Sequence, residues 1–124
     1  MQKGNTMTAS STAETVQAFN DGIRGLAKEP ATSAVMKSFH AMHQAATAPG
    51  ALDSSVKELL ALAIAISTQC DGCIAWHVTN AVKSGATREQ VLEAIGVAVM
   101  MGGGPATYYG SKAAAALDSV AAGG

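Results

Sequence analysis

Residues 58–77 read ELLALAIAISTQCDGCIAWH, and this stretch decides the fold. Its first part, Leu59–Ile66, is apolar at every position, which is typical of a helix that is buried on all sides. The run is far shorter than the roughly 20 apolar residues that a helix needs to cross a bilayer. We therefore predict a helix that needs neighbours on every side, within an all-helical domain.

Breaking residues divide the rest of the chain into further helices. Alanine is the commonest residue, and no strand-like alternation with hairpin dipeptides is present. Ser55–Glu58 and Thr87–Gln90 fit capping boxes at two helix starts, and Gly85 is suited to a helix end. The pattern predicts helices over about 13–28, 32–46, 55–68, 73–84, 87–101 and 106–120.

The predicted helices form one all-α domain, a bundle of about six helices over residues 13–122. Residues 1–12 are polar and aperiodic, and we expect them to be a flexible N-terminal arm. Gly102–Gly104 follows a helix and has no lysine beside a serine or threonine. We therefore expect a tight connection between two helices there and no phosphate-binding loop.

The composition excludes several classes of function. Only 14% of the 124 residues are charged and 48% are hydrophobic, which is not typical of a disordered chain. A net charge of −1 and five aromatic residues give no basic patch and no stacking platform for nucleic acid or an anionic membrane. The N-terminus also lacks the charged and then apolar pattern of a signal peptide. We expect a cytoplasmic protein that binds neither nucleic acid nor membranes.

Two predicted helices are too apolar for a small monomer. Residues 59–66 carry no polar side chain, and residues 91–101 carry a single charge. A domain of this size has little interior to surround both helices. We therefore predict a homo-oligomer whose interface buries part of their surface.

The only two cysteines of the chain, Cys70 and Cys73, are three residues apart, and His77 follows one helical turn later. Residues at these spacings share one face of a helix. A neighbouring imidazole can accept a thiol proton or stabilise the thiolate, which is the reactive form. In a cytoplasmic protein such a pair is more often catalytic or metal-binding than structural. The motif therefore predicts a redox site.

A zinc site is the alternative interpretation of the motif. Cys70, Cys73 and His77 would supply three ligands, and either His40 or His43 the fourth. Zinc sites usually collect their ligands from two separate knuckles, whereas this motif lies on one helical stretch. We favour the redox site, expect no bound metal, and expect His40 and His43 at a helix edge or an interface.

Two further roles stay open at this point. Glu58 fits the third position of a capping box that begins at Ser55, but it can also contact the Cys/His cluster across a helix packing contact. Of the two thiols, Cys73 has the nearer base in His77, whereas Cys70 lies at the positive end of the helix dipole. Spacing alone does not decide either question.

Glu58, eleven intervening residues and then Cys70-x-x-Cys73-x-x-x-His77 resemble the signature of the AhpD-like alkylhydroperoxidases, a branch of the carboxymuconolactone decarboxylase superfamily. Further stretches are similar to that family in order and spacing. They are residues 57–63, 70–77, 85–91 and 101–105. The similarity covers about residues 35–120.

The resemblance implies an AhpD-like helical bundle that assembles into trimers or hexamers. It also implies that Cys73 is oxidised by the peroxide, that Cys70 is the resolving thiol and proton donor, and that His77 and Glu58 form a proton relay. One departure is Gly72, because the well-studied peroxidases of this family have a further histidine at that position. The decarboxylase branch generally lacks the cysteine pair, which disfavours decarboxylation.

We therefore expect a thiol-dependent peroxidase that reduces hydroperoxides through a thiolate, a sulfenic acid and an intramolecular disulfide. A dithiol, either a protein or a lipoyl-type compound, would regenerate the enzyme, and no cofactor is expected. A general disulfide oxidoreductase or a redox sensor would use the same cysteine pair. A metal-binding or non-catalytic helical oligomer is the alternative from another class.

Overall fold

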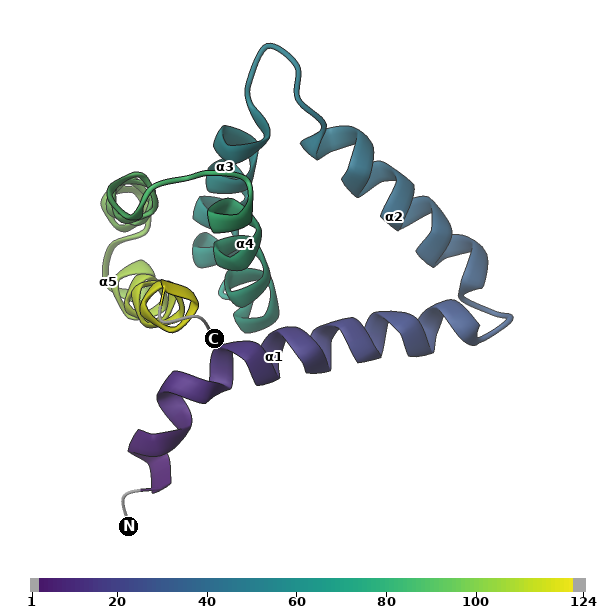
Figure 1. Ribbon diagram of the computed structural model, residues 1–124, viewed down its shortest axis with the longest axis horizontal. Helices are drawn as coiled ribbons and strands as arrows, with labels where there is room; N and C mark the ends of the chain where they lie inside the picture. The colour runs from purple at the N-terminus through teal and green to yellow at the C-terminus, as the bar shows by residue number, and fades with distance from the viewer. Residues whose placement is uncertain (1–2, 122–124) are drawn as a thin grey trace.

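A computed structural model of the chain describes residues 3–121, with side chains described from Thr12 onward. The described residues form α-helices joined by short connections and contain no strand. The helices are α1 (Lys3–Lys28), α2 (Ser33–Thr47), α3 (Ser54–Ser67), α4 (Asp71–Lys83) and α5 (Arg88–Ala121). The predicted all-α class is confirmed (Figure 1).

Helix α1 begins at Lys3, ten residues before the expected start at Ala13. Residues 3–12 are therefore helical, where the sequence predicted an irregular arm. The polarity of these residues shows only that they have no apolar face to bury. They contain no proline, so a helix that forms from residue 13 can continue toward the N-terminus through them. Residues 1–2 of the expected arm and residue 122, the expected domain end, lie outside the described residues.

Helix α5 is a helical hairpin, because Gly103 breaks it with a left-handed backbone (φ 68°, ψ −141°) that favours glycine. The halves pack antiparallel: Arg88 Nη1 donates to Asp118 Oδ1 at 2.7 Å, and a Cβ on Gly110 would lie 3.0 Å from Ile95 Cγ2. These halves correspond to the helices predicted over 87–101 and 106–120. The connection predicted at Gly102–Gly104 is shorter than expected, because Gly103 is its one non-helical residue.

The helix ends confirm two of three predicted capping signals. The Thr87 amide donates to Gln90 Oε1 at 2.9 Å, and the Gln90 amide donates to Thr87 Oγ1 at 3.2 Å. After α4, Gly85 has φ 103°. The Gly85 amide donates to the Val82 carbonyl and the Ala86 amide to the Ala81 carbonyl, as in a Schellman motif. The box predicted at Ser55 is wrong, because Asp53 is the N-cap residue of α3.

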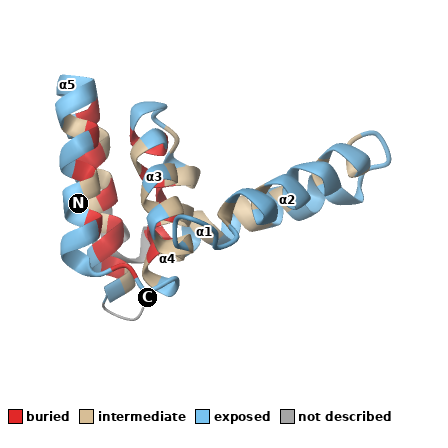
Figure 2. Cartoon of the chain, turned by 90° about the horizontal axis from the view of Figure 1, so that it is seen from above, coloured by how far each residue is buried: buried red, intermediate tan, exposed pale blue. Residues whose placement is uncertain are grey.

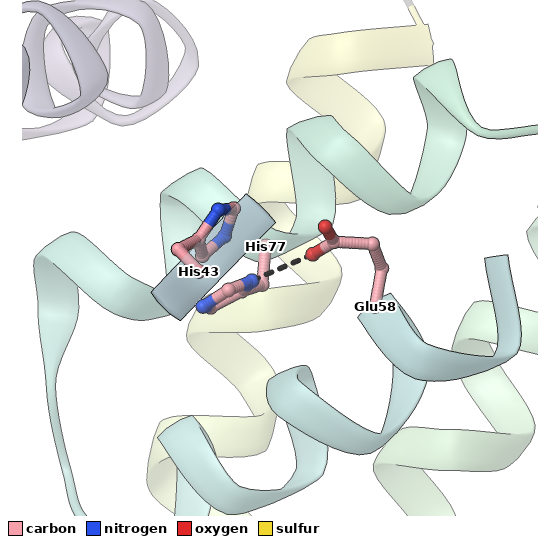
Figure 3. Close-up of side chains that lie close together, drawn as sticks. All are labelled: His43, Glu58 and His77. Carbon is pink, nitrogen blue, oxygen red and sulfur yellow. Dashed lines mark hydrogen bonds and ion pairs between the residues drawn. The ribbon is translucent and has the colours of Figure 1, made fainter. Parts of the chain in front are cut away.

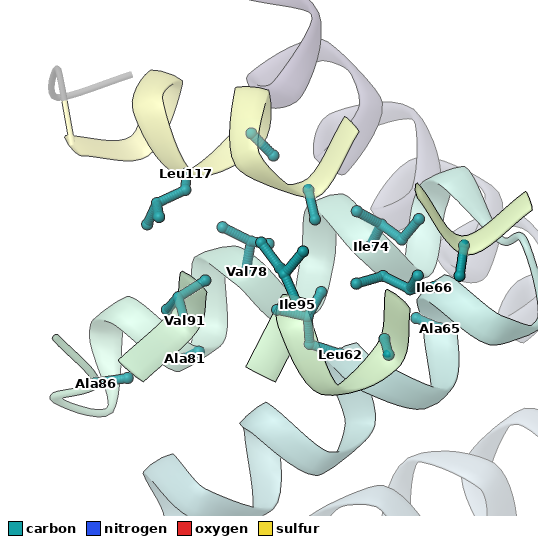
Figure 4. Packing of buried hydrophobic residues seen from close by; sticks show 14 residues of the cluster. Leu62, Ala65, Ile66, Ile74, Val78, Ala81, Ala86, Val91, Ile95 and Leu117 are labelled. Atoms are coloured by element: carbon teal, nitrogen blue, oxygen red, sulfur yellow. The ribbon is translucent and has the colours of Figure 1, made fainter. Parts of the chain in front are cut away.

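The core lies between α3, α4 and the two halves of α5, and α1 packs across α4 and α5 (Figures 1 and 4). Its largest fully buried side chains are Leu62, Ile66, Leu117, Val78 and Val91. Figure 4 shows side chains of all three helices meeting in this space. The long apolar run of α3 is therefore buried along one side, and this fixes α3 beside α4.

Helix α2 projects away from this core and contains no buried residue (Figure 2). Its apolar residues Val35, Phe39 and Met42 follow helical spacing and are all exposed. Leu60 and Ile64 of α3 are also more than half exposed, at 52% and 63%. The apolar helices are thus only partly covered within one chain. None of the helices in the described part of the chain is both long and apolar enough to cross a membrane.

Candidate active site

Cys70 and Cys73 form a disulfide at the start of α4. Their Cα atoms are 5.2 Å apart, within the usual range for a disulfide. Cys70 is the N-cap residue of α4, and its Sγ accepts a hydrogen bond from the Cys73 amide at 3.2 Å. Both cysteines are half-buried. The pair is therefore within reach of a small reactant and has backbone N–H groups directed toward it.

The start of α4 is also attached to the second half of α5. Lys112 Nζ lies 3.2 Å from each carboxylate oxygen of Asp71, the residue between Cys70 and Gly72. The hydrogen bond with Asp71 raises the pKa of Lys112, whose ammonium also lies 5.3 Å and 5.4 Å from the ring centres of Tyr108 and Tyr109. The ion pair is exposed and contributes little stability, but it links the first turn of α4 to the second half of α5.

Glu58 and His77 form a buried pair that links α3 to α4. His77 Nδ1 lies 2.7 Å from Glu58 Oε1, with 14% and 5% of the two side chains exposed (Figure 3). A carboxylate this buried needs a partner, and an ionised carboxylate can only accept hydrogen bonds. With Glu58 ionised, Nδ1 of His77 carries the hydrogen and Nε2 is left for other chemistry. Glu58 thus pairs with His77 and does not cap α3.

His43 of α2 is the residue whose role spacing alone did not reveal. Its ring stacks on Trp76, with 4.8 Å between the ring centres. It also lies 6.1 Å from the ring of His77 (Figure 3). One ligand atom from each of His43, Glu58 and His77 lies within 4.8 Å of the others. His40, the other histidine of α2, is exposed. Sequence spacing does not predict that a residue of α2 lies beside α4. That contact depends on the angle at which the helices pack.

Phe19 of α1 covers the turn between the cysteines. A Cβ on Gly72 would lie 3.3 Å from Cδ1 of the Phe19 ring. The same ring meets Trp76 edge-on, with centres 5.4 Å apart. The position at which the peroxidases have a second histidine is therefore packed against an aromatic ring, and a larger side chain there would displace Phe19.

A cavity of about 420 Å³ lies between α1 and α2. Its walls include the apolar side chains of Ile23, Met36 and Phe39, together with His43 and Trp76. The charged side chains Arg24 and Lys37 also line it. The cavity therefore gives a small molecule or an ion a path from solvent to the ring of His43.

The four residues predicted for the site fall into two pairs. Cys70 is bonded to Cys73, and Glu58 is hydrogen-bonded to His77. Cys73 and His77 are four residues apart on α4 and so share one of its faces. Oxidation of a dithiol to a disulfide removes two electrons and two protons, and the imidazole one turn later is a group that can accept a proton.

Comparison with known proteins agrees with this fold. Residues 33–116 match the model of the carboxymuconolactone decarboxylase family. An uncharacterised protein of Cupriavidus necator is 42% identical over 90 residues, which cover 73% of this chain and 80% of that protein. Uncharacterised protein 4 of the cox locus of Paracoccus denitrificans is 43% identical over 90 residues, which cover 73% and 81%.

Two solved structures resemble the chain closely. The apo form of a carboxymuconolactone decarboxylase family protein from Legionella pneumophila has a TM-score of 0.82 and 39% identity, covering 87% of this chain and 95% of that one. A protein of the same family from Thermotoga maritima, described with a possible involvement in the antioxidative response, has a TM-score of 0.77 and 27% identity. The alignment covers 88% of this chain and 91% of the Thermotoga chain.

The buried pair yields a stability prediction. Glu58→Ala leaves His77 Nδ1 without its acceptor, and we expect the free energy of unfolding to fall by about 1–3 kcal/mol. Ser55→Ala is the control, because Ser55 does not cap α3, and its effect should stay within about 0.5 kcal/mol. Urea unfolding of both variants measures this. Equal losses would mean that the capping box, and not the pair, stabilises this region.

Proposed function

The chain belongs to the carboxymuconolactone decarboxylase family, and on that premise we propose that it is a thiol-dependent peroxidase that reduces hydroperoxides through Cys70 and Cys73. The observation that carries this proposal is the disulfide at the N-terminus of α4, one turn before a buried Glu58–His77 pair. The possible antioxidative involvement of the Thermotoga relative supports the same chemistry.

The proposed cycle has three steps. The Cys73 thiolate attacks the terminal oxygen of a hydroperoxide, the O–O bond breaks, and the products are a Cys73 sulfenic acid and, after protonation, an alcohol. The Cys70 thiolate then attacks the Cys73 sulfur, which forms the disulfide and breaks the S–O bond. The departing hydroxide takes a proton from the Glu58–His77 pair or from solvent and leaves as water. Finally a dithiol, either a protein or a lipoyl-type compound, reduces the disulfide by thiol–disulfide exchange and is itself oxidised.

The geometry at the helix start supports a resolving role for Cys70. Its sulfur occupies the N-cap position of α4 and accepts the Cys73 amide hydrogen. Backbone N–H groups and the positive end of the helix dipole stabilise a thiolate there. Such a thiolate is ready to attack a sulfenic acid three residues away, with little change in the backbone.

We assign Glu58 and His77 to proton transfer in this cycle. The attack by Cys73 needs a deprotonated sulfur, and the departing alkoxide needs a proton. His77 lies one turn after Cys73, and its Nδ1 is held by Glu58, which leaves Nε2 for exchange. Gly72 supplies no second histidine, so this relay is shorter than that of the well-studied family members.

A stoichiometric pulse of cumene hydroperoxide on the reduced protein tests the cycle. We expect two thiols to be lost per chain and peptide mapping to find a Cys70–Cys73 disulfide within one chain. Cys70→Ser should stop at a Cys73 sulfenic acid that dimedone traps, and Cys73→Ser should react no faster than a free thiol. An unchanged thiol count, or only disulfides between chains, would overturn the proposal.

The same reduced protein can be mixed with a small disulfide in place of the peroxide. A peroxidase should react much faster with cumene hydroperoxide than with the disulfide. The opposite preference would assign the pair to a general disulfide oxidoreductase.

We also propose that the protein assembles as a homotrimer or homohexamer. Val35, Phe39 and Met42 form an exposed apolar stripe on α2, and Leu60 and Ile64 form another on α3. Together with Met100 and Met101 of α5, which are 72% and 76% exposed, they leave more apolar surface uncovered than a monomer usually carries. A second copy of the chain can bury these faces.

Light scattering at micromolar concentration tests the assembly. We expect a trimer or hexamer for the wild type and a smaller species for Met42→Glu, because the new charge would lie in the buried interface. Gln44→Glu is the matched control, since residue 44 lies on the opposite side of α2 and should leave the mass unchanged. A monomeric wild type would contradict the proposal.

A further inference from the structure

His43 has a feature that the proposed cycle does not use. Its Nε2 is buried and has no hydrogen-bond partner in the described part of the chain. A buried polar atom without a partner is costly, and in folded proteins such an atom commonly faces an ordered water, an ion or a reacting group. The stacking contact with Trp76 holds the ring in place, so the imidazole cannot easily turn toward solvent. We therefore expect a water, an ion or another ligand to lie close to Nε2 of His43.

Two other ligand atoms meet His43 in this region. One atom each from His43, Glu58 and His77 lies within 4.8 Å of the others, and the three residues come from α2, α3 and α4 (Figure 3). Zinc bound at about 2.0–2.2 Å in a tetrahedron separates its ligands by about 3.3–3.6 Å. The three atoms, which lie within 4.8 Å of one another without an ion, would have to adjust to that spacing on binding.

The chemical types of the three ligands also favour zinc. Two imidazoles and one carboxylate are a set that holds zinc with the fourth position open to water. Glu58 is 4% exposed and the two histidines are half-buried, so this is an enclosed group of ligands. The cavity between α1 and α2, whose wall includes His43, supplies an entry path.

We propose that His43, Glu58 and His77 bind a divalent transition-metal ion, with Zn²⁺ as the ion that fits these ligands best. This site is distinct from the zinc site considered for the cysteine motif, because it uses no thiol. The ion would take one ligand atom from each of the three residues, and each of these atoms would have to be free of a proton to bind it.

Binding of the ion would hold α2 against the rest of the chain. Helix α2 has no buried residue, so only surface contacts join it to the rest of the chain. A metal ion that takes one ligand from α2 and two from α3 and α4 clamps this helix to the core. An ion that binds only the folded chain raises its thermal stability, and the gain grows with the ratio of ion concentration to dissociation constant.

The test uses the full chain in its disulfide form, so that the cysteines are not available as ligands. Protein stripped with EDTA and dialysed is titrated with ZnCl₂ against a chromophoric chelator. Trp76, the only tryptophan, reports binding through its fluorescence because it contacts His43. We expect one Zn²⁺ per chain, a change in Trp76 emission and a higher melting temperature.

Four variants test whether His43 is a ligand and whether the cysteines are not. His43→Gln should weaken the affinity by at least about a hundredfold, and His43→Ala repeats the test without a side-chain amide. His40→Gln is the matched control on the same helix, and it should bind as the wild type does. The double variant Cys70→Ser/Cys73→Ser should also bind normally.

Absence of saturable Zn²⁺ binding by the wild type would overturn the proposal. So would an unchanged affinity in both His43 variants that fold normally by circular dichroism, or loss of binding in the double cysteine variant. The peroxide reaction measured in the presence of EDTA is independent of these results. Failure of the metal site and failure of the dithiol cycle are therefore distinguishable.

Discussion

The hydrogen bond between Glu58 and His77 is the interaction on which the site depends. It places a carboxylate in the interior between α3 and α4, where only a strong partner makes its burial tolerable. The apolar run of α3 supplies the packing that holds the two helices together around the pair. The helix that begins at the disulfide-bonded cysteines is thereby fixed relative to the helix that carries the carboxylate.

The surroundings of this pair are built from all parts of the chain. Lys112 of α5 holds the start of α4 through Asp71, and Phe19 of α1 covers the cysteine turn. His43 of α2 stacks on Trp76 and brings a ligand atom close to the same pair. The cysteines thus lie half-buried at a helix end, while Glu58 is buried between the helices. In the proposed cycle this separation would let a reductant reach the disulfide without exposing Glu58.

The sequence predicted those features that depend on local chemistry. The Thr87–Gln90 box and the Gly85 helix end formed because their partners lie within four residues. The Ser55 box did not form, because Glu58 is hydrogen-bonded to His77 of another helix. Helix α1 begins earlier than the polarity of residues 3–12 suggested. Phe19 and His43 lie in the site because of how α1 and α2 pack against the rest of the chain. Short sequence spacings do not predict that packing. Family resemblance pointed to Glu58, but spacing alone left its role open.

In the proposed cycle Glu58 and His77 act as one unit on Cys73, and a double-mutant cycle on the peroxide reaction tests whether they do. The rate constant for Cys73 sulfenic acid formation is measured near pH 7 by stopped flow for the reduced wild type, Glu58→Gln, His77→Gln and the double variant. If the pair is a unit, each single change slows the reaction by about 10²-fold or more, and the double variant is no slower than the slower single one. Unchanged rates in both single variants, or effects that multiply in the double variant, would contradict the claim.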